Sequence, residues 1–302
     1  MSSPHTPLPS APLPAARTRI KVCGLTREQD VDAAVAAGVD AVGFVLYATS
    51  PRAVTPERAA QLASRLPPFV TPVLLFVNET ATNVIAASAM VAGAMLQFHG
   101  DETAEECWEA SGRGTRPYLR AARIPLGEQG FGFDLVEYAH VHSRARAILL
   151  DAHVEGYGGG GKAFHWSLLP PSVASHLVLS GGLTPANVTD GIVQVRPRGL
   201  SLAVDVSSGV ELDGPDGQPI KGVKDAGKIQ PEQVSVGKFN NITKAIEICR
   251  TSRTILGANG ISGEFPIMRH ANNLESVLTY EGTVEMHALV LGQALTGVPA
   301  FR

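Results

Sequence analysis

Two short stretches, LVLSGGLTPANV (177–188) and LAVDVSSGVE (202–211), share a pattern in which an apolar run ends at glycine and serine. Each run has the length of one β-strand, and its aliphatic residues suit a strand that is buried on both faces. In the first stretch, Thr184-Pro185 follows the glycines, and this pair is typical of a helix N-terminus. The pattern predicts a strand, a tight loop and then a helix.

Six further apolar runs of strand length precede these two. The eight predicted strands are Ile20–Cys23, Ala41–Leu46, Pro72–Val77, Ala94–Phe98, Tyr118–Ala121, Ala147–Asp151, Leu177–Ser180 and Leu202–Val206. Thr26 with Gln29 predicts a capping box, Thr55-Pro56 a second helix start, and Gly38 the end of the first helix. Eight strands that alternate with helices over about 200 residues predict an α/β fold, the (β/α)8 TIM barrel. A doubly wound sheet is the alternative.

Composition narrows the class of protein. The 302 residues carry 28 acidic and 25 basic side chains, a net charge of −3 that argues against nucleic-acid or anionic-membrane partners. No apolar run approaches the ~18–20 residues of a membrane span, which predicts a cytoplasmic protein. Three widely separated cysteines, without a CxxC motif, predict neither a disulfide framework nor a zinc finger. Residues 1–19 are rich in Pro, Ala and Ser and predict a disordered tail.

Active-site side chains of such barrels gather at the carboxyl ends of the strands. The residues found there are Cys23, Arg52, Asn78, Gln97, His99, Arg120, Arg123 and Asp151. A thiol and a carboxyl group can serve as base and acid, and Arg52 can bind a carboxylate through two parallel hydrogen bonds. Each also has a structural interpretation: Cys23 as an inert buried thiol, Asp151 as a capping residue, and His99 as a structural histidine.

Two loops predict a phosphate site. Gly181 and Gly182 follow the seventh strand, and Ser207-Ser208-Gly209 follow the eighth, where such barrels commonly bind phosphate. No metal site is predicted, because His140 and His142 have no third ligand nearby in the sequence. Cys107 lies in a predicted helix and is expected to pack in the core.

The motifs of the phosphoribosylanthranilate isomerase family are similar, in order, to IKVCGLT (20–26), FVLYATSPRAV (44–54), LFVN (75–78), QFHGDET (97–103), ILLDAHVEGYGGGGKAFHW (148–166), LSGGLTPANV (179–188) and VDVSSGVE (204–211). The resemblance covers residues 20–229. It implies a (β/α)8 barrel of tryptophan biosynthesis that converts N-(5-phosphoribosyl)anthranilate to an amino-deoxyribulose phosphate by an Amadori rearrangement, without a cofactor. By this resemblance Cys23 is the general base and Asp151 the general acid.

The same resemblance implies further substrate-binding residues. Arg52 matches the arginine that holds the anthranilate carboxylate, Gln97 and His99 fall in a family motif, and the glycine and serine loops match the phosphate site. One departure is Gly160, which replaces the threonine of the family's GGTGK motif, and Tyr47-Ala48-Thr49 is an unusual lead into the Ser-Pro-Arg loop. A different phosphosugar barrel enzyme is the alternative, and a monomer or homodimer is expected.

Residues 230–302 resemble the C-terminal end of acyl-CoA dehydrogenases, closest to glutaryl-CoA dehydrogenase. The similar pieces are LGANGI (256–261), RHANNLES (269–276) and TYEGT (279–283). In that family the glutamate of TYEGT, here Glu281, is a base, and LGANGI helps to contact FAD. Only a fragment of such an enzyme is present and Phe239 stands where arginine is usual, so no dehydrogenase activity is predicted. A flavin- or acyl-CoA-binding function is the less favoured alternative.

The start of this C-terminal stretch carries an amphipathic pattern. Its apolar residues recur at spacings of three and four: Val236, Phe239, Ile242, Ile246 and Cys249. The pattern predicts a helix over residues 231–255 that packs where the last helix of the barrel would lie, followed by a further helical stretch from Leu256 onward. The alternative is that the whole of residues 230–302 folds away from the barrel on a flexible joint near Ile229.

Overall fold

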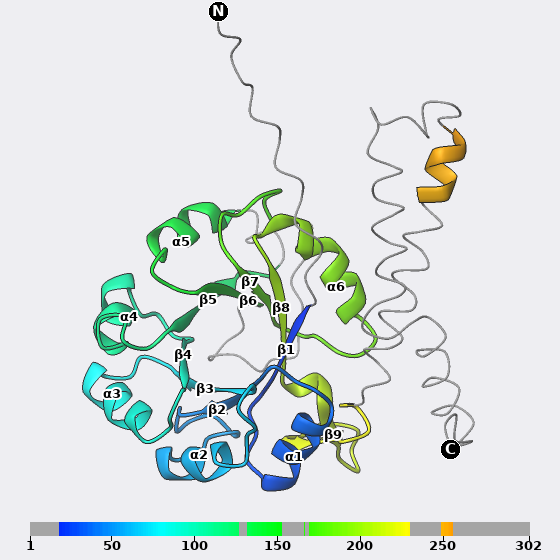
Figure 1. Ribbon diagram of the computed structural model, residues 1–302. Helices are drawn as coiled ribbons and strands as arrows, with labels where there is room; N and C mark the ends of the chain where they lie inside the picture. The colour runs from blue at the N-terminus through cyan, green and yellow to red at the C-terminus, as the bar shows by residue number, and fades with distance from the viewer. Residues whose placement is uncertain (1–17, 127–131, 153–165, 167–168, 230–248, 256–302) are drawn as a thin grey trace, which may run out of the picture. The chain divides into compact units, whose positions relative to one another are not determined.

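The computed structural model describes residues 18–126, 132–152, 166, 169–229 and 249–255. Within them, eight parallel strands close into a barrel in chain order, from β1 to β8 and back to β1 (Figure 1). The strands are β1 Arg19–Cys23, β2 Ala41–Val45, β3 Thr71–Phe76, β4 Met95–Phe98, β5 Tyr118–Ile124, β6 Ala147–Ala152, β7 Leu177–Leu179 and β8 Leu202–Val206. All eight predicted strands are confirmed, and the doubly wound sheet is excluded.

Helices surround this barrel (Figure 1). They are α1 Glu28–Ala36, α2 Pro56–Ala63, α3 Ala81–Ala89, α4 Ala104–Ala110, α5 Leu135–Val141 and α6 Val188–Val195, with two 3₁₀ turns, η3 Arg196–Arg198 and η4 Ser208–Val210. Each of these α-helices joins one strand to the next parallel strand, the connection that a parallel barrel requires. None of the helices in the described ranges is long and apolar enough to cross a membrane.

Alternation along the strands separates two layers of buried residues. In β6, Ile148 and Leu150 pack with the helices, whereas Ala147 and Leu149 belong to a cluster inside the barrel. Because side chains alternate along a strand, Asp151 also faces the interior, at the carboxyl end of β6. The same alternation directs Lys21 and Cys23 of β1 inward, and the site is therefore assembled inside the barrel mouth.

An antiparallel hairpin follows β8. It consists of β9 Glu211–Asp213 and β10 Pro219–Lys224. The hairpin is tied to the start of the barrel, because the Thr26 hydroxyl donates to the carbonyl of Gly222 at 2.7 Å and the Lys224 amide donates to Asp30 at 3.2 Å. Ile229, just beyond it, packs in the main core.

Helix capping agrees with the sequence at some positions and differs at others. Thr55 caps α2 by accepting from the Arg58 amide, and Gly38 follows α1 with a φ of +78°, both as predicted. The predicted capping box of Thr26 is wrong: Arg27 is the N-cap of α1, and the Thr26 side chain is bonded to Gly222. Helix α6 begins after Asn187, three residues beyond the predicted Thr184 start.

Several predictions lie wholly or partly outside the described residues. These are residues 1–17 of the predicted tail 1–19, the loop that contains Gly160, and the segments around Phe239 and Glu281. Of the predicted helix over 231–255, the structure describes only 249–255, which are helical. The predicted packing of that helix, and the boundaries 1–19, 20–229 and 230–302, stay predictions.

Thr55→Ala is expected to lower the free energy of unfolding by about 0.5–2 kcal/mol, because it removes the cap of α2 and leaves the Arg58 amide without its acceptor. Thr55→Ser keeps a hydroxyl acceptor and should remain close to the parent chain. Urea unfolding measures both variants. Equal stability of all three proteins would show that this cap contributes nothing.

Candidate active site

Cys23 ends β1 and lies at the mouth of the barrel with only 5% of its surface exposed. Its neighbours include the buried apolar residues Val45, Leu75 and Val77. Burial raises the pKa of the Cys23 thiol, and Asp205 adds to this effect, whereas the ammonium groups of Lys21 and Lys224 oppose it. The net shift is upward, which favours the protonated thiol.

A buried ion pair lies beside this thiol. The Lys21 Nζ atom donates to Asp205 Oδ2 at 2.9 Å, and both side chains are about 5% exposed. Burial alone would lower the pKa of Lys21, but Asp205 and Cys23 raise it on balance. The other carboxylate oxygen, Asp205 Oδ1, is buried and has no partner among the described residues. Sequence reasoning missed both residues, although Lys21 precedes Cys23 by two positions and therefore shares its face of β1.

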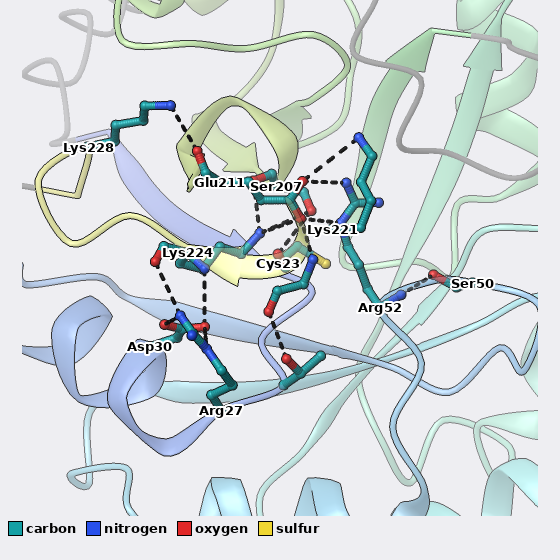
Figure 2. A network of polar contacts seen from close by, with 12 residues as sticks. Cys23, Arg27, Asp30, Ser50, Arg52, Ser207, Glu211, Lys221, Lys224 and Lys228 are labelled. Atoms are coloured by element: carbon teal, nitrogen blue, oxygen red, sulfur yellow. Dashed lines mark hydrogen bonds and ion pairs between the residues drawn. The ribbon is translucent and has the colours of Figure 1, made fainter. Parts of the chain in front are cut away.

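The hairpin brings a second charged cluster to the same end of the barrel (Figure 2). The fully buried Glu211 accepts from Arg52 Nε at 2.6 Å and from Arg52 Nη2 at 2.9 Å, a bidentate ion pair. Lys224 lies 3.5 Å from Glu211 and donates to the Ser207 carbonyl at 2.8 Å. Ser207 in turn donates through its hydroxyl to the Cys23 carbonyl at 3.0 Å.

These contacts shift the pKa values of the charged groups. Burial alone would raise the pKa of Glu211, but the hydrogen bonds from Arg52 and the charge of Lys224 lower it, so Glu211 is ionised. Burial lowers the pKa of Lys224 to about 8 despite the attraction of Glu211. Arg52 is predicted to bind a substrate carboxylate, but in the structure its guanidinium group is already bonded to the carboxylate of Glu211. Sequence analysis did not identify Glu211 or Lys224 as neighbours of Arg52.

Asp151 is the second predicted catalytic group, and a hydrogen-bonded chain orients it. Its Oδ2 atom lies 2.9 Å from His99 Nε2, and its Oδ1 atom accepts from the Ala152 amide at 2.9 Å. Gln97 Nε2 lies 2.9 Å from His99 Nδ1, so Gln97, His99 and Asp151 form one chain of polar contacts. All three side chains are buried, and Gln97 Oε1 has no hydrogen-bond partner within the described ranges.

The two predicted phosphate loops meet in space. A Cβ atom on Gly209, in the turn η4 after β8, would collide with the Leu183 carbonyl in the loop after β7, so the backbones touch there. Gly181 has a φ of +78°, and a Cβ on it would lie 2.7 Å from Asp151 Oδ1. Glycine is therefore required at position 181 both for the backbone angle and for the space beside the carboxylate. Gly182 and Ser208 lie within the same two loops.

Other strand-end residues have structural roles. Arg120 donates to the Phe98 and Gly100 carbonyls and to Glu102, and Glu102 also accepts from the Asn78 amide. Cys107 is buried in α4, and burial raises its pKa to about 12, as expected of a packing residue. No group of three or more potential metal ligands occurs among the described residues.

Comparison with known proteins identifies the family to which this barrel belongs. The family described as N-(5'phosphoribosyl)anthranilate (PRA) isomerase matches residues 20–232. An N-(5'-phosphoribosyl)anthranilate isomerase of Methylibium petroleiphilum is 61% identical over 71% of this chain and 91% of the relative. The chain belongs to the phosphoribosylanthranilate isomerase family. It is an isomerase, as the sequence motifs predicted.

Solved structures of the family share the barrel. The phosphoribosylanthranilate isomerase of Thermotoga maritima has a TM-score of 0.59 at 38% identity, and covers 71% of this chain and 96% of its own. A second structure, in complex with reduced 1-(o-carboxyphenylamino)-1-deoxyribulose 5-phosphate, has a TM-score of 0.56 at 35% identity over 70% of this chain and 95% of its own. Separately, the C-terminal domain of acyl-CoA dehydrogenases matches residues 221–296, which confirms the second resemblance.

Cys23 is expected to be protonated at neutral pH when no substrate is bound. Its raised pKa favours the neutral thiol, so the thiolate should form only as the pH rises above the ordinary thiol range of about 8.5. Thiolate absorbance in the ultraviolet, taken as the difference between the chain and its Cys23→Ser variant, isolates this one group. A fully formed thiolate at neutral pH would contradict the expectation.

Proposed function

We propose that the barrel converts N-(5-phosphoribosyl)anthranilate to 1-(2-carboxyphenylamino)-1-deoxyribulose 5-phosphate, with Asp151 as general acid and Cys23 as general base. The observation that carries this proposal is the placement of a buried carboxyl group and a buried thiol inside one barrel mouth, next to two touching glycine-rich loops. Family membership supplies the reaction. The described residues supply one group for each of the first two proton transfers that it needs.

The first step needs an acid. Asp151 donates a proton to the ring oxygen of the ribose, the bond from C1 to that oxygen breaks, and the nitrogen lone pair forms the C1 iminium. The carboxylate that remains accepts from the Ala152 amide and lies 2.9 Å from His99 Nε2, so it is stabilised after the proton has left. His99 and Ala152 thus support the charge that develops on the acid.

The second step needs a base. The Cys23 thiolate removes the proton from C2, the electrons of that C–H bond form the C1–C2 double bond, and the iminium becomes a neutral enolamine. Transfer of a proton from the C2 hydroxyl to C1 then gives the ketone. One proton enters at the ring oxygen and one leaves C2, so the step is balanced, and proton exchange with water restores the thiolate and the acid.

Binding groups lie around these two residues. Arg52 uses Nε and Nη2 for Glu211, which leaves Nη1 to meet the anthranilate carboxylate. The buried Gln97 Oε1 acceptor suits a sugar hydroxyl, and His99 is the neighbouring contact. The loops with Gly181 and Gly182, and with Ser207, Ser208 and Gly209, would hold the phosphate through backbone amides and hydroxyls. The proposal includes a small-molecule substrate, no cofactor, and no nucleic-acid or membrane partner.

Assembly and location are part of the same proposal. Monomers generated from a dimeric isomerase of Thermotoga maritima are among the similar structures, at a TM-score of 0.54 and 34% identity over 70% of this chain and 95% of that one. A monomer or homodimer in the cytoplasm is accordingly the expected state of this chain.

Cys23→Ser and Asp151→Asn should each lower kcat by orders of magnitude while the fold persists, because a hydroxyl is a far weaker base and an amide cannot donate the proton. The parent chain should show a bell-shaped dependence of kcat/KM on pH, since the acid must be protonated and the base ionised. In Asp151→Asn the loss of activity at high pH should disappear. The decay of phosphoribosylanthranilate fluorescence measures turnover, and near-normal turnover in either variant would exclude that residue from its role.

Inorganic phosphate should inhibit competitively with the substrate, because it occupies the loops that are proposed to hold the phosphate of the substrate. The apparent KM should rise with phosphate concentration while kcat stays constant, with sodium chloride at equal ionic strength as the control. Noncompetitive inhibition would place the anion at another site.

A further inference from the structure

The proposed mechanism leaves one buried ion pair without a role. Lys21 of β1 and Asp205 of β8 face each other across paired strands inside the barrel, with Nζ and Oδ2 2.9 Å apart. A buried ion pair is costly to desolvate and is weak evidence for stability. Lys21 lies two residues before Cys23 on the same face of β1. This position indicates that the ion pair acts on the thiol.

The thiol and the lysine share the space above one glycine. A Cβ atom on Gly43 of β2 would lie 2.6 Å from Cys23 Sγ and 3.1 Å from Lys21 Cε, so both side chains pack over this residue. The carbon that bears the ammonium group is therefore beside the sulfur. Gly43 itself brings no charge to the site.

Charges that face Cys23 come from several elements. Lys21 is on its own strand, Asp205 on β8 and Lys224 on β10. Figure 2 shows Arg52 and Glu211, which form the neighbouring pair. The charges that act on Cys23 directly are the cations Lys21 and Lys224 and the anion Asp205, whereas Arg52 and Glu211 pair with each other. A thiolate at Cys23 makes the cluster neutral.

We propose that Lys21 is a positioning residue for the general base, held in place by Asp205, and that its ammonium group stabilises the Cys23 thiolate. This inference rests on the proposed function. As the thiolate forms its S–H bond with the proton from C2, Lys21 keeps its own proton and acts only through its charge. Asp205 fixes the ammonium group beside the sulfur and, as an anion, limits how strongly the thiolate is favoured.

If the proposal is right, removing the charge of Lys21 and removing the charge of Asp205 should change the thiolate fraction of Cys23 in opposite directions. Lys21→Met removes a cation near the sulfur and should lower the thiolate fraction of Cys23 at a given pH by about tenfold or more. Asp205→Asn removes an anion while it keeps an oxygen acceptor for Lys21, and should raise that fraction by a similar factor. A purely structural role would not move the two variants in opposite directions.

Thiolate absorbance tests this on the full chain. Each variant is titrated with pH and compared with the same variant that also carries Cys23→Ser, so that only Cys23 contributes to the difference. Lys221→Met is the matched control, because Lys221 is 40% exposed and its Nζ lies 3.9 Å from Glu211. That control should leave the titration of Cys23 unchanged.

Lys21→Met leaves Asp205 buried without its partner and can prevent folding. Lys21→Met combined with Asp205→Asn removes both charges, and its thiolate fraction should fall below that of Asp205→Asn alone. An unchanged or lowered fraction in Asp205→Asn, or an equal fraction in the double variant and in Asp205→Asn, would overturn the inference.

Turnover of Cys23→Ser separates this inference from the proposed function. If the titrations shift as expected and Cys23→Ser keeps full turnover, the ion pair acts on the thiol but Cys23 is not the base. If Cys23→Ser is inactive and the titrations do not move, Cys23 is the base and the role of Lys21 is wrong.

Discussion

Closure of eight parallel strands directs every second side chain of each strand into one shared interior, and the carboxyl ends meet at one mouth. Cys23 and Asp151 come from strands 128 positions apart in the sequence, and alternation alone places both inside. The same constraint places Lys21 and Asp205 inside, where charges must be paired. The chemistry of this barrel therefore follows from which polar residues occupy inward positions near the strand ends.

Local sequence signals predicted the part of the fold that depends on local physics. A buried strand needs a short apolar run, and all eight strands lie where such runs occur, with β5 extending three residues beyond its predicted end at Ala121. Thr55 caps the start of α2 and Gly38 follows the end of α1. Each role depends only on residues nearby in the sequence, so the sequence predicts it. Cys23 and Asp151 were predicted by their place at strand ends and by the family motifs.

The rest of the site depends on contacts between distant residues. Lys21 meets Asp205 across 184 positions, and Arg52 meets Glu211 across 159, so no local pattern could pair them. Thr26 fits a capping box by sequence, but its hydroxyl bonds to Gly222 on a hairpin that was not predicted. Alternation in β1 would have placed Lys21 beside Cys23, and this signal was available in the sequence.

The hairpin also bears on where the barrel part of the chain ends. The two family matches overlap at residues 221–232, so sequence similarity alone assigns this segment to both parts. Its contacts are with the barrel and with β9: Gly222 accepts from the Thr26 hydroxyl, the Lys224 amide donates to Asp30, and Lys228 donates to the carbonyl of Glu211. Without this segment, Glu211 would lose the hydrogen bond from the Gly222 amide and the nearby charge of Lys224. Lys228 makes the last of these contacts among the described residues, and residues 221–229 therefore pack with the barrel part of the chain.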